Sequence, residues 1–308
     1  MHKKMFMNTG IGHSSLLFTT SNSLLISMFE HNWNTDESSI KFPAGETLYL
    51  SDNEMTTEFT KLGKRAWVMP TATDYTKVKI AVRGTYSDAF IQNTLFAHGS
   101  MFKVTTSGFS KGILLLGASG SGKTTLLSAL NNDNEKFFEL LNDDWGPIQL
   151  DDKMMLSSGE RNIHIKLESL FRLNRTFNVE NAINIDYNCE TPRAIVGKKF
   201  IFPNCIDTHI QIDLIILLTR NFNEKSGAYK LSPTEALKKL EKGYYSKYYN
   251  KNEAFCNGSL YLPNEVIRQK HRHLYKRLFT SSKIVQINNT SSQELFIKTF
   301  YDVMEAKQ

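Results

Sequence analysis

The sequence predicts an α/β protein with a mixed sheet and a β-rich N-terminal layer. A short apolar strand, residues 113–116, runs into a glycine-rich loop and then into an apolar helix through Leu130. Residues 212–218 form the most apolar run in the chain, which is typical of a central strand. Residues 1–95 instead hold short apolar stretches bounded by polar turns. We therefore expect a β-rich layer, residues 1–95, packed on a core, residues 96–308.

Within the N-terminal layer, alternating apolar and polar residues predict half-buried strands. A polar turn separates the first two, and the polar stretch from residue 32 to residue 39 predicts a loop. The expected strands are Ser15–Thr20, Ser23–Met28, Thr47–Leu50 and Val78–Val82.

In the core, further strands are expected at Ser100–Val104 and Phe137–Leu141. One helix start is well marked: Ser232 can cap, Pro233 suits the first helical position, and Glu235 completes a capping box. Residues 291–294 repeat this logic and predict a C-terminal helix that ends near Glu305.

The motif that carries most chemistry is the glycine loop, defined as Gly117-Ala118-Ser119-Gly120-Ser121-Gly122-Lys123-Thr124. Glycines allow a backbone that turns successive N–H groups toward one anion, and the following helix adds its N-terminal amides and dipole. Lys123 is expected to reach the β- and γ-phosphates and Thr124 to offer a hydroxyl to Mg²⁺. The loop, with Thr125 at the helix start, therefore predicts a site for a nucleoside triphosphate with Mg²⁺. We expect ATP, although the loop by itself leaves GTP open.

Two adjacent carboxylates, Asp143 and Asp144, lie twenty residues after Lys123, at the end of an expected strand. Such a pair can divide its work, because one carboxylate can hold Mg²⁺ while the other accepts the proton of an attacking hydroxyl. We expect Asp144 to join Thr124 at the metal, and either Asp143 or Asp144 to be the base. The alternative is a solvated turn, since residues 142–147 are rich in turn formers.

The order of these motifs resembles a known family. Phe96-Ala-His-Gly-Ser100, the glycine loop and Leu141-Asn-Asp-Asp144 follow one another as in HPr kinase/phosphorylase and its PEP-carboxykinase-like relatives. Residues 214–220 and 231–236 are also similar to these kinases, so the resemblance covers roughly residues 95–240. It implies a P-loop core of the PEP-carboxykinase/HPr-kinase type, an aspartate base, and His98 near the transferring phosphoryl group. The Ile-Glu-Ile-Arg-Gly-Leu-Gly-type signature of true HPr kinases is missing, so HPr is not the expected acceptor.

Phosphoryl transfer also needs cations that neutralise the transferring group. The candidates are Arg161, Arg193, Lys198 and Lys199, with the segment 191–199 favoured because it combines a glycine with three cations. Exposed loop charges are the alternative.

Composition limits the partners. The chain has 308 residues, 41% of them hydrophobic, a net charge of +6 and three cysteines without metal-type spacing. These values predict a globular cytoplasmic protein with no membrane partner. The basic stretch from Arg268 to Arg277 predicts a solvated helix face, so no nucleic-acid partner is expected. A homo-oligomer stays open.

Two functions remain from the sequence. The first is an ATP-dependent kinase that transfers the γ-phosphoryl to a hydroxyl of a protein, peptide or small molecule. The acidic pair and His98 favour it, because a simple hydrolase needs no base for an organic hydroxyl. The alternative is a nucleotide-dependent switch or motor ATPase that acts on a macromolecular partner.

Overall fold

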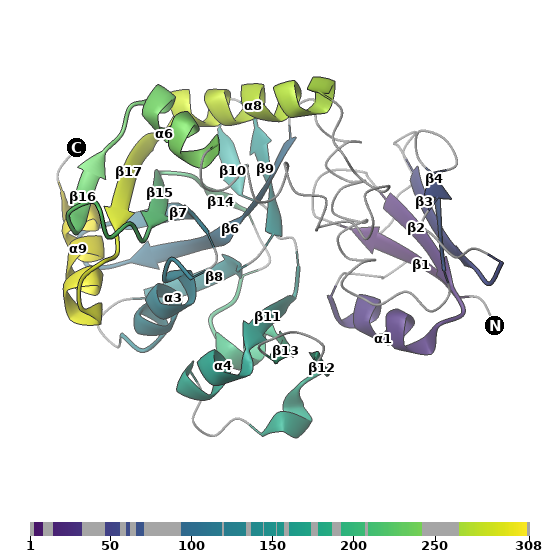
Figure 1. The fold of residues 1–308 in the computed structure, drawn as a ribbon. Coiled ribbons are helices and arrows are strands. Elements are labelled where there is room, and N and C mark those ends of the chain that lie inside the picture. The colour runs from purple at the N-terminus through teal and green to yellow at the C-terminus, as the bar shows by residue number, and fades with distance from the viewer. Residues whose placement is uncertain are drawn as a thin grey trace.

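The computed structural model combines helices with three sheets in its described part, so the protein is mixed α/β, as predicted (Figure 1). The structure describes residues 3–8, 15–32, 47–55, 60–61, 66–70, 94–118, 120–133, 137–143, 145–151, 153–156, 160–173, 178–186, 192–206, 209–241 and 265–306.

The N-terminal residues form a five-stranded sheet of order β1-β2-β3-β5-β4. β1 and β2 are antiparallel, whereas β2, β3 and β5 run parallel. The bounds are β1 Lys3–Asn8, β2 Ser15–Thr20, β3 Thr47–Asn53, β4 Thr60–Lys61 and β5 Ala66–Pro70. The strands expected at residues 15–20 and 47–50 are therefore confirmed, and the one expected at residues 78–82 lies outside the described residues.

The strand predicted at residues 23–28 is wrong, because this segment begins helix α1, Ser23–Asn32. Its buried residues, Leu25, Met28, Phe29 and Asn32, recur at the spacing of one helix face. The Asn22 side chain accepts hydrogen bonds from the N–H groups of Leu24 and Leu25 at 3.1 and 3.2 Å, which caps the helix. A parallel β2–β3 pair also needs a crossover, and α1 lies in that connection.

The largest sheet has nine strands in the order β14-β10-β9-β6-β7-β15-β17-β16, with β8 also paired to β6. Its bounds are β6 Thr94–Thr105, β7 Ser110–Gly117, β8 Phe137–Asn142, β9 Trp145–Leu150, β10 Met154–Leu156, β14 Ile210–Gln211, β15 Leu214–Thr219, β16 Gly227–Lys230 and β17 Lys283–Asn288. The expected central strand is confirmed as β15, which lies between β7 and β17 and runs parallel to both.

The long strand β6 organises one half of this sheet. One of its edges pairs with β7, and its other edge pairs first with β9 and then with β8. β6 begins at Thr94, earlier than the strand expected from residue 100. The extension arises because residues 94–98 pair with β9 and Gly99 pairs with Leu116 of β7.

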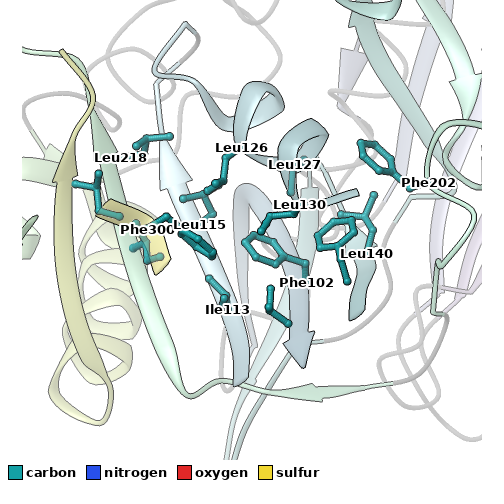
Figure 2. Close-up of a cluster of buried hydrophobic side chains, with 14 of the residues drawn as sticks. Phe102, Ile113, Leu115, Leu126, Leu127, Leu130, Leu140, Phe202, Leu218 and Phe300 are labelled. Atoms are coloured by element: carbon teal, nitrogen blue, oxygen red, sulfur yellow. The ribbon is translucent and has the colours of Figure 1, made fainter. Parts of the chain in front are cut away.

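Helices cover both faces of the large sheet. Ile113 and Leu115 of β7 pack with α3, Lys123–Asn131, and α9, Gln293–Glu305, in the cluster drawn in Figure 2. Leu114 and Leu116 point the other way, into a second cluster with α6, Pro233–Leu240, and α8, Glu265–Thr280. This period of two explains why the strand reads as a continuous apolar run, since both of its faces are buried.

The two helix starts predicted from capping residues are confirmed. Ser232 and Glu235 form the expected capping box at the start of α6. Ser292 caps α9 by accepting from the Leu295 N–H at 3.3 Å, and α9 ends at Glu305 as expected.

A small antiparallel sheet of order β11-β13-β12 lies beside the large one (Figure 1). Asn32 at the end of α1 holds the first residues of β11, because its carbonyl oxygen accepts from Arg161 N and its side-chain oxygen from Asn162 N, both at 2.9 Å. The bounds here are β11 Asn162–Lys166, α4 Leu167–Leu173, η2 Val179–Asn181, β12 Asn184–Asp186, β13 Arg193–Gly197 and α5 Lys198–Ile201.

Candidate functional site

The glycine loop follows the carboxyl end of β7 and leads directly into α3, which is the predicted strand–loop–helix unit. Gly120 and Gly122 have φ angles of 82° and 107°, a region that residues with a Cβ rarely adopt. Glycine rather than a capping side chain therefore stands at the N-cap of α3. Ser119 lies outside the described residues.

Lys123, the first residue of α3, folds back over the loop. Its Nζ donates to the Gly117 carbonyl oxygen at 2.6 Å and to the Ala118 carbonyl oxygen at 3.2 Å. The ammonium group is thus held against the backbone carbonyl groups at the start of the loop. A phosphate entering this loop would meet a lysine that is already positioned.

Asn289, which follows β17, braces the loop from two strands away in the large sheet. Its Nδ2 donates to the Ser121 carbonyl oxygen at 3.1 Å, and its own N–H donates to Thr219 at 2.8 Å. A Cβ on Gly122 would lie 2.5 Å from this Nδ2, so a larger residue there would displace the Asn289 side chain from its hydrogen bond. Sequence reasoning missed Asn289, because only the parallel pairing of β15 and β17 brings it to the loop.

His98 and Gly99 reach the loop through the register of the sheet. Gly99 pairs with Leu116, the residue before the glycine loop, and His98 pairs with Trp145 of β9. A Cβ on Gly99 would lie 2.6 Å from the Leu115 carbonyl oxygen, so glycine permits the close approach of β6 and β7.

The turn between β8 and β9 brings Asp143 to the same row. Met101 pairs with Asn142 and His98 with Trp145, so Gly99 and Ser100 lie opposite the turn that holds Asp143. The buried Ser100 hydroxyl donates to Asp143 Oδ1 at 2.8 Å. Asp143 is thus not in a freely solvated turn, and Ser100 orients its carboxylate. Asp144 lies outside the described residues.

These residues line one open pocket of about 740 Å³. The predicted residues in its lining are His98, Gly120, Gly122, Lys123, Thr124, Thr125, Asp143 and Arg193. It also contains residues that sequence reasoning did not assign to a site, notably His164, Lys166, Arg220, Asn289 and Gln293.

No protein-family model and no curated protein sequence matches this chain.

Of the four candidate cations, only Arg193 lines the pocket. Lys198 is 2% exposed, and its Nζ donates to the Leu141 carbonyl oxygen at 2.7 Å. The β6–β8 register shifts at Leu141, whose neighbours Leu140 and Asn142 pair with Phe102 and Met101. The Lys198 ammonium group therefore binds the carbonyl oxygen of a residue at a β-bulge. Arg161 and Lys199 are exposed outside the pocket lining. Arg220 could have been suspected, because it ends the apolar run of β15.

Within the described residues, no group of three or more histidine, cysteine, aspartate or glutamate side chains is arranged to hold a metal ion. A Mg²⁺ ion that bridges nucleotide phosphates needs less, since it uses one or two carboxylates with phosphate and water oxygens. Thr124 and Asp143 both line the pocket, and this donor set fits such an ion.

No helix in the described part of the chain is long and apolar enough to cross a membrane.

Proposed function

We propose that the protein is an ATP-dependent kinase that transfers the γ-phosphoryl group to a hydroxyl of an acceptor. The observation that carries the proposal is a single pocket lined by the glycine loop with Lys123 and Thr124, by Asp143 and by His98. A phosphate cradle and a carboxylate base are recurring parts of phosphoryl transfer to a hydroxyl, and a histidine beside them can donate to the phosphate oxygens. The proposed fold is the P-loop core of the PEP-carboxykinase/HPr-kinase type.

The proposed mechanism begins at the glycine loop. Loop N–H groups and the start of α3 bind the phosphates, and the Lys123 ammonium exchanges the Gly117 carbonyl oxygen for phosphate oxygens. Thr124 and one aspartate of the pair would hold Mg²⁺, which supplies charge neutralisation on the phosphate oxygens. The acceptor hydroxyl is then placed in line with the bond between the γ-phosphorus and its bridging oxygen.

An aspartate of the pair acts as the base. It accepts the hydroxyl proton while the acceptor oxygen bonds to the γ-phosphorus, and the electron pair of the broken bond leaves with ADP. Ser100 keeps the Asp143 carboxylate oriented through its 2.8 Å hydrogen bond. His98, Arg193 and Arg220 line the same pocket and can stabilise the charge that develops on the transferring group.

Incubation of the protein with ATP labelled at the γ-phosphate and an extract of its host tests the proposal. We expect one labelled species, lost in parallel reactions with an Asp143→Asn, Asp144→Asn double variant. Release of labelled inorganic phosphate without any labelled acceptor would support the switch or motor ATPase instead. The double variant keeps the glycine loop and Lys123, so its ATP binding serves as the folding control.

A further inference from the structure

One wall of the pocket comes from the small sheet and is cationic. β11 contributes His164, Ile165 and Lys166, α4 contributes Ser169, and β13 contributes Arg193. None of these residues belongs to the loop that would bind the triphosphate. Among the described lining residues the only carboxylate is Asp143.

Lys166 and Arg193 lie directly opposite each other in the antiparallel β11–β13 pair. Both side chains are exposed, and neither makes an ion pair with a side chain that the structure describes. Like charges at directly opposed positions repel each other, and their side chains share one face of the sheet. The register of β12 also places Asp186 opposite Arg193, so Lys166 is the cation at which an anionic ligand would relieve the repulsion.

The register shows which edge of β11 is open to a ligand. Leu167 N donates to the Pro192 carbonyl oxygen, and Lys198 N donates to the Arg161 carbonyl oxygen. The odd-numbered residues of β11 and its flanks therefore form the backbone hydrogen bonds to β13. The backbone N–H and C=O groups of Lys166 consequently point away from β13. Among the described strands β11 lies at the edge of its sheet, and the first N–H on its outer edge, Asn162 N, already donates to Asn32 Oδ1. Three successive residues farther along β11 line the pocket. Because successive side chains alternate between faces, such a lining means that the strand presents its edge to the pocket.

We propose that the acceptor of the kinase is an extended acidic peptide that adds to the edge of β11 as a further strand. Its backbone pairs with Lys166, and its carboxylates bind the Lys166 and Arg193 cations. A serine or threonine hydroxyl of this strand then lies in the same pocket as Asp143. This inference rests on the proposed kinase function and names the acceptor class for that site.

Direct binding tests the charge requirement. Fluorescein-labelled heptapeptides with a central serine flanked by Asp and Glu, by Asn and Gln, or by Lys are titrated with the full-length protein and a non-hydrolysable ATP analogue. We expect the acidic peptide to bind on the order of tenfold more tightly than the neutral one. Lys166→Glu with Arg193→Glu should reverse this preference toward the basic peptide. The matched control Lys230→Glu changes an exposed lysine outside the pocket lining and should keep the acidic preference.

Alternate N-methylation tests the strand geometry. The acidic peptide is N-methylated on its odd residues in one version and on its even residues in the other, which blocks one edge at a time. Loss of binding in only one version supports strand addition. Equal binding by both versions and the parent, or equal binding of acidic and neutral peptides, overturns the proposal.

These readouts are independent of turnover. If the acidic peptide binds but no acceptor is ever labelled, the kinase function fails while the β11 site stands. If the host extract yields a labelled neutral small molecule and the acidic peptide does not bind, the kinase function stands and the acidic-peptide acceptor is wrong.

Discussion

The Ser100 hydroxyl donates a 2.8 Å hydrogen bond to Asp143 Oδ1 and so ties the middle of β6 to the turn that follows β8. Ser100 is fully buried, whereas Asp143 lines the pocket. The buried Ser100 hydroxyl thus orients the Asp143 carboxylate at the pocket wall.

Substitution of Ser100 by alanine should loosen Asp143 without touching the phosphate cradle. We expect kcat for transfer to fall roughly tenfold, the equivalent of about 1.4 kcal/mol, while the Kd for ATP stays unchanged. Steady-state kinetics and calorimetry measure the two values. Ser110→Ala is the matched control, because it removes a hydroxyl that hydrogen-bonds Thr105 Oγ1 at 3.0 Å, at the far end of the same hairpin. A loss of ATP affinity equal to the loss of kcat would contradict a positioning role.

Gly99→Ala should destabilise the fold. The new methyl group would lie 2.6 Å from the Leu115 carbonyl oxygen and 2.9 Å from Leu116 Cδ2. We expect the free energy of unfolding to fall by roughly 1–3 kcal/mol, as is usual for overpacking. Urea denaturation measures it. Gly108→Ala, in the turn of the same hairpin, adds a methyl group with no atom within 4 Å and should cost far less. Equal losses in the two variants would contradict the close-approach explanation.

Lys198→Met should leave the Leu141 carbonyl oxygen without its ammonium donor. A buried polar group that loses its partner costs roughly 1–3 kcal/mol, and we expect the free energy of unfolding to fall by that amount. The neighbouring exposed Lys199 provides the control, since Lys199→Met should change stability by less than about 0.5 kcal/mol. If both variants unfold at the same urea concentration, Lys198 has no such structural role.

His271 should make stability depend on pH. Burial lowers the pKa of this residue from 6.5 to about 4. The unfolded chain therefore takes up the proton first as the pH falls, so stability is complete above pH 6.5 and declines toward pH 4. This separation of pKa values corresponds to a loss of about 3 kcal/mol at full effect. Thermal unfolding of wild type and His271→Gln between pH 7 and pH 4 should show a flatter profile for the variant. The exposed His273 on the same helix is the control, and a flatter profile in His273→Gln would contradict the assignment.

Local signals predicted the parts of the fold that depend on neighbouring residues. The glycine loop, the start of α3 and the Ser232 capping box are short patterns whose geometry is set by a few backbone angles and side-chain bonds. The same kind of reasoning misassigned residues 23–28, because a short apolar run fits either a strand or one buried helix face. Phe29 and Asn32, beyond the run, extend the helical spacing that Leu25 and Met28 begin.

The remaining site residues depend on long-range pairing. Asn289 reaches Ser121 across 168 positions of sequence through the parallel strands β15 and β17. Lys166 and Arg193 meet only because β11 and β13 share a register, and Lys198 was misassigned because its burial follows from packing against β8. Such contacts carry no local signature, so a single sequence gives their residues no distinguishing pattern.

The proposed kinase has an aspartate base beside a phosphate cradle. The most direct measurement compares transfer of the labelled γ-phosphoryl group and ATP affinity in wild type, Asp143→Asn, Asp144→Asn and Lys123→Ala. We predict that at least one aspartate variant loses transfer by a factor of about 10²–10⁴ while its affinity for ATP survives. Lys123→Ala should lose ATP affinity and transfer together. Full transfer activity in both aspartate variants would contradict the account.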